Sequence, residues 1–317
     1  MNLFEKLYTL IIFSAVMIGI GIGQVELIRT NAESFIVPLL VAMIYITFLQ
    51  IPIEEIKKAF KNIKFTYTSV IINFVWTPIL AWLLAMIFLG NNPALYIGFI
   101  MLMVTPCTDW YLIFTGIAKG NVALSTAILP LNLILQVILL PLYLLIFGGT
   151  TGVIELGFLV ESILIVLFIP LVLAVLTKLF LKNKQQLSES LISNLSVFPI
   201  IFLGLAIVAM FATQGQLLLD NLDLLWLITL PLLLFFVINF IVGQKVGHVM
   251  KYSYSDRTSL SLTTLARNSP IALAIAMTAF PDQPLIALVL VIGPLLELPI
   301  LAIITQLLLF FNKSKNQ

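Results

Sequence analysis

The sequence predicts an all-α polytopic membrane protein whose ten transmembrane helices form two inverted five-helix repeats, with helices four and nine broken and crossed. Three observations predict this fold. First, 61% of the 317 residues are hydrophobic and only 9% are charged, whereas soluble domains carry about 25% charged residues. Second, apolar runs long enough to cross about 30 Å of hydrocarbon recur along the chain. Third, prolines interrupt corresponding runs in the two halves. We expect one integral membrane domain over 1–317, with repeats at about 1–150 and 151–317.

The polar segments between apolar runs predict the helix boundaries and the orientation of the chain in the membrane. The predicted helices cover residues 7–23, 35–53, 66–89, 95–117, 122–148, 155–181, 189–213, 222–247, 258–280 and 284–311. Of the 16 Lys and Arg residues, all but two lie at the amino terminus or after the even-numbered helices, and Arg29 stands alone on the opposite side. Basic loops favour the cytoplasm. We therefore expect a multi-pass protein of the cell membrane with both termini cytoplasmic.

Four prolines mark the internal repeat. Pro106 and Pro130 in the first half, and Pro270 and Pro294 in the second, are each 24 residues apart, and the offset between halves is 164 residues. Because five helices are an odd number, the second copy would be inverted, as in many secondary transporters. The alternative is coincidence, since prolines are frequent in membrane helices.

Helix breaks predict the position of the substrate site. A proline removes a backbone donor and frees a carbonyl, which lipid cannot satisfy, so such a break must face protein or a wet cavity. Breaks at Pro106 and Pro270 would bring four helix ends to one point near the bilayer midplane. The alternative is that the prolines only kink well-packed helices.

Polar residues accompany both breaks. Those beside the first are Cys107, Thr108 and Asp109, and those beside the second are Arg267, Asn268 and Ser269. Ionisable residues at membrane depth are candidates for function. Because Arg267 stays protonated, it needs a counter-charge or a polar cavity, and Asp109 is an available partner. The pair could equally be structural. A lone membrane cysteine is most often an apolar filler, but this polar setting makes Cys107 a candidate ligand.

Three further polar residues lie within predicted helices five and ten. Glu297, in "GPLLELP", is a carboxylate at membrane depth and is predicted to carry protons. Asn132 and Gln136 are four residues apart, so they share a helix face. They could line the same cavity or join helices as neutral amides.

Several function classes lack sequence support. There is no nucleotide-binding loop, HExxH or GxSxG pattern, so we expect neither an enzyme nor ATP-driven transport, and no cofactor. The net charge of +2 is too small to suggest a nucleic-acid partner. Transport would depend on an ion gradient, with a proton or sodium as the coupling ion, or on the membrane potential, or it would be passive. The other expected partners are a small-molecule or inorganic substrate and the lipid bilayer.

The stretches "PCTDWYLIFTGIAKGN", "ALAIAMTAF" and "VIGPLLELP" resemble the arsenite efflux permeases of the bile acid:sodium symporter superfamily. The resemblance implies a core domain containing the crossed helices four and nine, which moves against a panel domain. It also implies that the essential thiol is Cys107 and the essential carboxylate is Glu297. A thiolate is a soft ligand suited to arsenite. The resemblance thus favours efflux of arsenite, and of antimonite, in exchange for protons.

The sequence departs from those permeases at "DW", which follows the Pro-Cys-Thr motif, and at "ARNSP" in helix nine, where they carry Asn-Asn-Phe-Glu. Sodium-coupled bile acid transporters resemble the chain through "AKGNVALS", where Ser125 matches one of their sodium ligands. Thr263 and Leu129 stand where two other ligands would be, so a complete pair of sodium sites is not expected. The alternative function is a sodium- or proton-coupled symporter of a small organic anion, with Arg267 as the anion-binding group.

Overall fold

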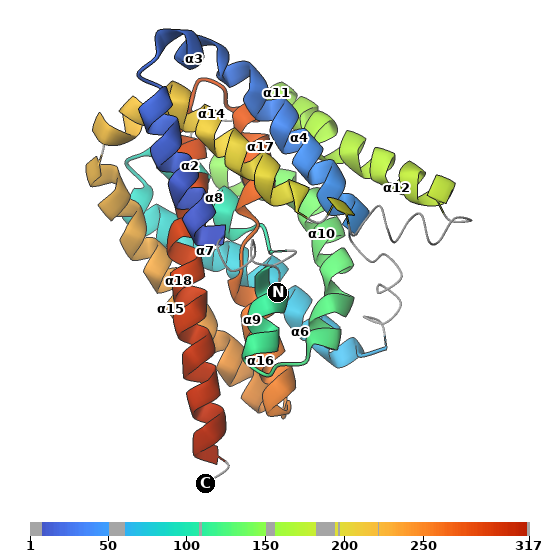
Figure 1. The fold of residues 1–317 in the computed structure, drawn as a ribbon. Helices are drawn as coiled ribbons and strands as arrows, with labels where there is room; N and C mark the ends of the chain where they lie inside the picture. Colours follow the sequence, from blue (N-terminus) through green and yellow to red (C-terminus); the bar gives the residue numbers. More distant parts are fainter. Residues whose placement is uncertain are drawn as a thin grey trace. The chain divides into compact units, whose positions relative to one another are not determined.

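A computed structural model describes residues 8–50, 61–107, 110–149, 156–181, 194–195, 197–220 and 222–315. All regular elements in these ranges are helices (Figure 1). Seven of them, counting only the described residues and joining segments that run on without a gap, are long and apolar enough to cross a membrane, and three apolar helices are shorter. These findings agree with a polytopic, all-helical membrane protein.

The chain divides into two compact units, and each unit takes segments from both halves of the sequence. In the first unit, α14 packs against both α2 and α4, and α12 packs against α4 (Figure 1). Its helices are α2 (Tyr8–Ile22), α3 (Glu26–Asn31), α4 (Glu33–Gln50), α11 (Leu156–Ile163), η4 (Leu164–Phe168), α12 (Ile169–Leu181), α14 (Phe198–Asp220) and α17 (Ser269–Ala279).

Close packing in the first unit depends on small residues in α2 and directly after it. A Cβ built on Gly19 would lie 2.7 Å from the Val208 carbonyl oxygen, and one built on Gly23 would meet the Ala212 backbone. Small residues four apart let membrane helices approach closely. The sequence "GIGIG" therefore brings α2 into backbone contact with α14.

The second unit contains α8, α9, α10 and α16, in which α9 packs against both α10 and α16. α10 begins where the Asn121 side chain accepts a hydrogen bond from the Leu124 N–H (3.2 Å), and Ser253 caps α16 in the same way. The unit's helices are α6 (Ile63–Ile71), η2 (Ile72–Trp76), α7 (Thr77–Leu89), α8 (Pro93–Met103), α9 (Trp110–Ile117), α10 (Val122–Gly148), α16 (Tyr254–Leu265) and most of α15 (Leu222–Val249) and α18 (Pro284–Lys315).

The predicted third helix contains a feature that the sequence analysis did not anticipate. Residues 63–89 form one continuous run, but its centre, η2, is a π-helical turn. Such a turn widens the helix and frees a carbonyl. The Tyr143 hydroxyl of α10 donates a hydrogen bond to the Phe74 carbonyl oxygen at 2.6 Å. The widened turn is thus held by α10.

Candidate functional site

The first helix break follows α8. The Thr105 hydroxyl donates to the carbonyl oxygens of Met101 (2.9 Å) and Leu102 (3.1 Å), and so caps the end of this half-helix. Pro106 follows in a non-helical segment, and α9 begins at Trp110. The predicted helix 95–117 is therefore broken at the expected proline. Cys107 is buried beside the break.

The second break follows α16. Ala266 is extended, with φ −71° and ψ 139°, and α17 begins at Ser269. The interruption thus lies at residues 266–268, whereas Pro270 is the second residue of the next helix. The interruption lies within a few residues of Pro270, which stands in the first turn of α17, where a proline has no intrahelical N–H bond to lose.

Backbone hydrogen bonds join the two broken segments. The Cys107 N–H donates to the Ala266 carbonyl oxygen (2.9 Å), and the Asn268 N–H donates to the Thr105 carbonyl oxygen (2.7 Å). Pro106 and Arg267 are consequently paired as in an antiparallel sheet. Extended segments leave backbone groups unpaired inside a membrane. Here the groups of one break satisfy those of the other.

The Arg267 side chain is 2% exposed and its guanidinium is surrounded by oxygen acceptors. Nε donates to the Leu265 carbonyl oxygen (3.0 Å), and one terminal nitrogen donates to the Met103 carbonyl oxygen (2.8 Å). The other donates to the Thr264 carbonyl oxygen and to Asn73 Oδ1 (3.3 Å). The group also lies 5.4 Å from the centre of the Phe235 ring. Most of its N–H donors are therefore already engaged.

Glu297 of α18 lies at the same point. Its Oε1 atom accepts a hydrogen bond from the backbone N–H of Arg267 (2.8 Å), and the side chain is 3% exposed. Cys107 lies at the same place, because its N–H donates to the carbonyl oxygen of Ala266, the residue before Arg267. The structure thus brings together the thiol, the carboxylate and the guanidinium that the sequence analysis selected.

The structure describes some of the other predicted site residues and leaves two of them out. Asn268 and Ser269 are buried at the second break. Thr108 and Asp109 lie outside the described residues, so the predicted pairing of Asp109 with Arg267 stays a prediction. Asn132 and Gln136 are buried on α10, and among the residues that the structure describes their amide atoms have no hydrogen-bond partner.

Sequence reasoning missed Asn73. This residue lies in η2, is fully buried, accepts from Arg267 and donates to the Thr263 carbonyl oxygen at 3.5 Å. A lone amide within the apolar run "VIINFVW" was an available signal. Asn239 of α15 was also missed: its Oδ1 accepts from the Trp76 indole N–H at 2.9 Å, and its amide donates to Thr77 at 3.3 Å.

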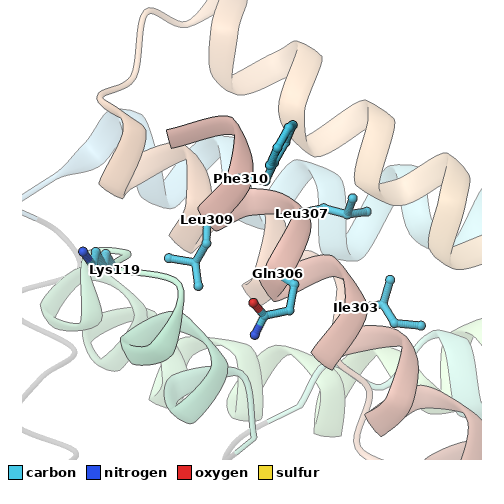
Figure 2. A pocket seen from close by; sticks show the side chains of 6 residues that line it. All are labelled: Lys119, Ile303, Gln306, Leu307, Leu309 and Phe310. Atoms are coloured by element: carbon cyan, nitrogen blue, oxygen red, sulfur yellow. The ribbon is translucent and has the colours of Figure 1, made fainter. Parts of the chain in front are cut away.

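A groove of about 660 Å³ lies elsewhere in the second unit. Figure 2 shows the residues that line it: Ile303, Gln306, Leu307, Leu309 and Phe310 of α18, and Lys119 after α9. It contains none of the predicted site residues. The paired breaks therefore remain the candidate site.

Comparisons with known proteins agree with this picture. An uncharacterized transporter of Synechocystis sp. is 25% identical to the chain, over 97% of the chain and 88% of its own length. The arsenical-resistance protein Acr3 of Corynebacterium glutamicum is 25% identical, over 83% of the chain and 74% of its own length. Acr3 of Alkaliphilus metalliredigens is 22% identical, over 96% and 92%.

A family model shows to which family the chain belongs. The model described as the Sodium Bile acid symporter family matches residues 37–221, which is more than half of the chain. With the apolar helices described above, this match identifies a multi-pass membrane transporter. The chain belongs to the Sodium Bile acid symporter family.

Proposed function

We propose that this transporter exports arsenite, and antimonite, from the cytoplasm in exchange for protons. The observation that carries the proposal is the position of Cys107. The only thiol of the chain is buried at the paired breaks, in the same cluster as Glu297. Thiolates bind soft semimetals, and a buried carboxylate in a membrane can carry protons. The names of the two Acr3 relatives support the same substrate.

The charge of the site also favours arsenite. At neutral pH arsenite is mainly the uncharged trihydroxide, which needs hydrogen-bonding groups rather than a fixed counter-charge. The guanidinium of Arg267 is engaged by carbonyl and amide oxygens. The amides of Asn132 and Gln136 are neutral and could bind hydroxyl groups. We assign proton coupling to Glu297, and substrate binding to Cys107, Thr108, Asp109, Asn132, Arg267, Asn268 and Ser269.

The proposed architecture has ten membrane spans in two inverted five-helix repeats, with both termini in the cytoplasm of a cell-membrane protein. Its support is the matched position of the two breaks. Each half of the sequence contributes one broken helix, α8 with α9 and α16 with α17, and the breaks pair with each other.

The test is arsenite accumulation in cells that lack other arsenite exporters. Cells expressing the wild-type protein should accumulate less arsenite than cells with an empty vector. Cys107→Ser and Cys107→Ala should both abolish this difference, because each removes the soft ligand without a large change in volume. Thr278→Ser is a matched control, since this hydroxyl bonds only within its own helix, to the Ala274 and Ile275 carbonyls. Full efflux by Cys107→Ser in a normally inserted protein would overturn the proposal.

A second candidate is symport of a small organic anion, which the family's description favours. Such a substrate needs a cation that can reach it. If Arg267 were that cation, Arg267→Gln would abolish uptake of organic anions, and Cys107→Ser would leave it unchanged. The same pair of variants thus distinguishes the two candidates.

A further inference from the structure

The carbonyl oxygens around Arg267 come from the ends of two half-helices. Met103 is the last residue of α8, and Thr264 and Leu265 are the last two residues of α16. The final carbonyls of a helix have no intrahelical partner and carry the negative end of its dipole. The guanidinium of Arg267 donates hydrogen bonds to all three. One side chain thus satisfies the carboxyl ends of both broken helices.

This arrangement is an oxygen cage around a positive charge. Three backbone carbonyls and the Asn73 amide oxygen are the acceptors. Glu297 contributes from outside the cage, because its hydrogen bond goes to the backbone N–H of Arg267 rather than to the guanidinium. Neutral oxygen ligands are those that hard cations prefer. The position is chemically a cation site, and the chain fills it with its own guanidinium.

In secondary transporters with broken helices, unwound carbonyls and half-helix carboxyl ends coordinate the coupling sodium ion or proton. We propose that Arg267 is a tethered cation that permanently occupies this position, so that the protein needs no sodium ion at the paired breaks. Removal of the guanidinium leaves the same oxygen atoms facing one another. They then bind a small monovalent cation such as Na⁺.

The inference rests on the geometry of the breaks and on membership in a transporter family, and it is independent of the substrate. Sodium binding to purified protein can be measured without arsenite or any other transported molecule. Failure of the arsenite proposal would therefore leave this test unaffected, and a negative result here would leave arsenite efflux unaffected.

The experiment measures thermal unfolding of purified protein in NaCl and in choline chloride at equal ionic strength. The wild-type melting temperature should be the same in both salts. Arg267→Ala should melt at a lower temperature than wild type in choline chloride and should recover in NaCl, with a saturable rise on the order of 2–4 °C for each kcal/mol of binding. Arg257→Ala is the matched control, because it removes an arginine from α16, the helix that precedes the break. Its melting temperature should not depend on sodium.

Two results would overturn the inference. Saturable stabilisation of the wild type by Na⁺ would show that Arg267 does not fill the cation position. A folded Arg267→Ala without any response to Na⁺ would show that the guanidinium is a structural group only. If Arg267→Ala does not fold, Arg267→Lys replaces it: this variant keeps the charge, so it should fold and remain insensitive to sodium. A sodium response of Arg267→Lys would count against the tethered cation.

Discussion

At the scale of single residues, Glu297 connects a titratable group to the backbone of the second break. Its Oε1 atom accepts the Arg267 N–H bond at 2.8 Å. A glutamine at this position can still accept that bond but cannot exchange a proton. We expect Glu297→Gln to fold normally and to lose the dependence of arsenite efflux on the proton gradient. Arsenite uptake into everted vesicles, whose cytoplasmic face is outside, measures this at several external pH values, and an unchanged pH profile would remove Glu297 from proton coupling.

Asn73 and Asn132 are both buried amides, but they differ in whether they make hydrogen bonds. Asn73 accepts from Arg267, whereas Asn132 has no partner among the described residues. Asn73→Leu should lower the free energy of unfolding by about 1–3 kcal/mol, because it leaves a buried charged donor without an acceptor. Asn132→Leu should be neutral or stabilising, since it removes polar atoms that make no hydrogen bond with the part of the chain that the structure describes.

Thermal unfolding of both amide variants in the same detergent compares them directly. Equal destabilisation by the two substitutions would contradict the bonding described here. Because we assign Asn132 to the substrate site, Asn132→Leu should nevertheless reduce arsenite efflux. This variant should therefore lose transport without losing free energy of unfolding.

At the scale of elements, the contact between α2 and α14 gives a sharp prediction. A Cβ at Gly23 would collide with the Ala212 backbone, whereas a Cβ at Gly21 would meet nothing within 4 Å. Gly23→Ala should therefore force the helices apart and lower the free energy of unfolding by about 1–3 kcal/mol. Gly21→Ala is the matched control and should be neutral or slightly stabilising, because alanine favours the helix. The melting temperatures of the two variants provide the measurement.

Much of the element order could be predicted from the sequence. The predicted helix 122–148 has the bounds of α10, because polar residues flank an apolar run there. The prolines indicated which helices are interrupted. The π-helical turn at η2 could not be predicted, because it depends on Tyr143 contacting the Phe74 carbonyl from a distant helix. The exact position of the second break could not be predicted, because Pro270 alone does not show whether a helix ends before it or begins there.

Three of the predicted site residues lie together in the structure, but their hydrogen bonds could not be predicted from the sequence. Cys107, Arg267 and Glu297 stood out as polar residues in apolar runs, and the structure brings them together. The acceptors of Arg267 are mostly backbone carbonyls, and backbone geometry at a helix end carries no side-chain signal in a sequence. The sequence suggested a carboxylate partner, Asp109, which lies outside the described residues. Asn73 is a side-chain acceptor and was missed although its amide stands alone in an apolar run.

At the scale of the whole molecule, the distribution of basic residues predicts the orientation of the chain. Cys107 is the only cysteine, so Cys107→Ser gives a background without thiols. In this background Arg29→Cys should react with a membrane-impermeant maleimide in intact cells, and Lys119→Cys only after permeabilisation. Both positions are exposed, which makes them a matched pair. Labelling of Lys119→Cys in intact cells would reverse the proposed topology.

The backbone pairing of Pro106 with Arg267 has a consequence for how motion is shared between the two halves of the sequence. The Cys107 and Asn268 amide protons are held by carbonyls of the opposite break. A change of backbone conformation at one break would disturb these bonds of the other, so we expect the two interruptions to open together. The amide protons of residues 107 and 268 should consequently show one common free energy of opening in hydrogen exchange, after correction for their intrinsic rates, because a single opening event exposes both.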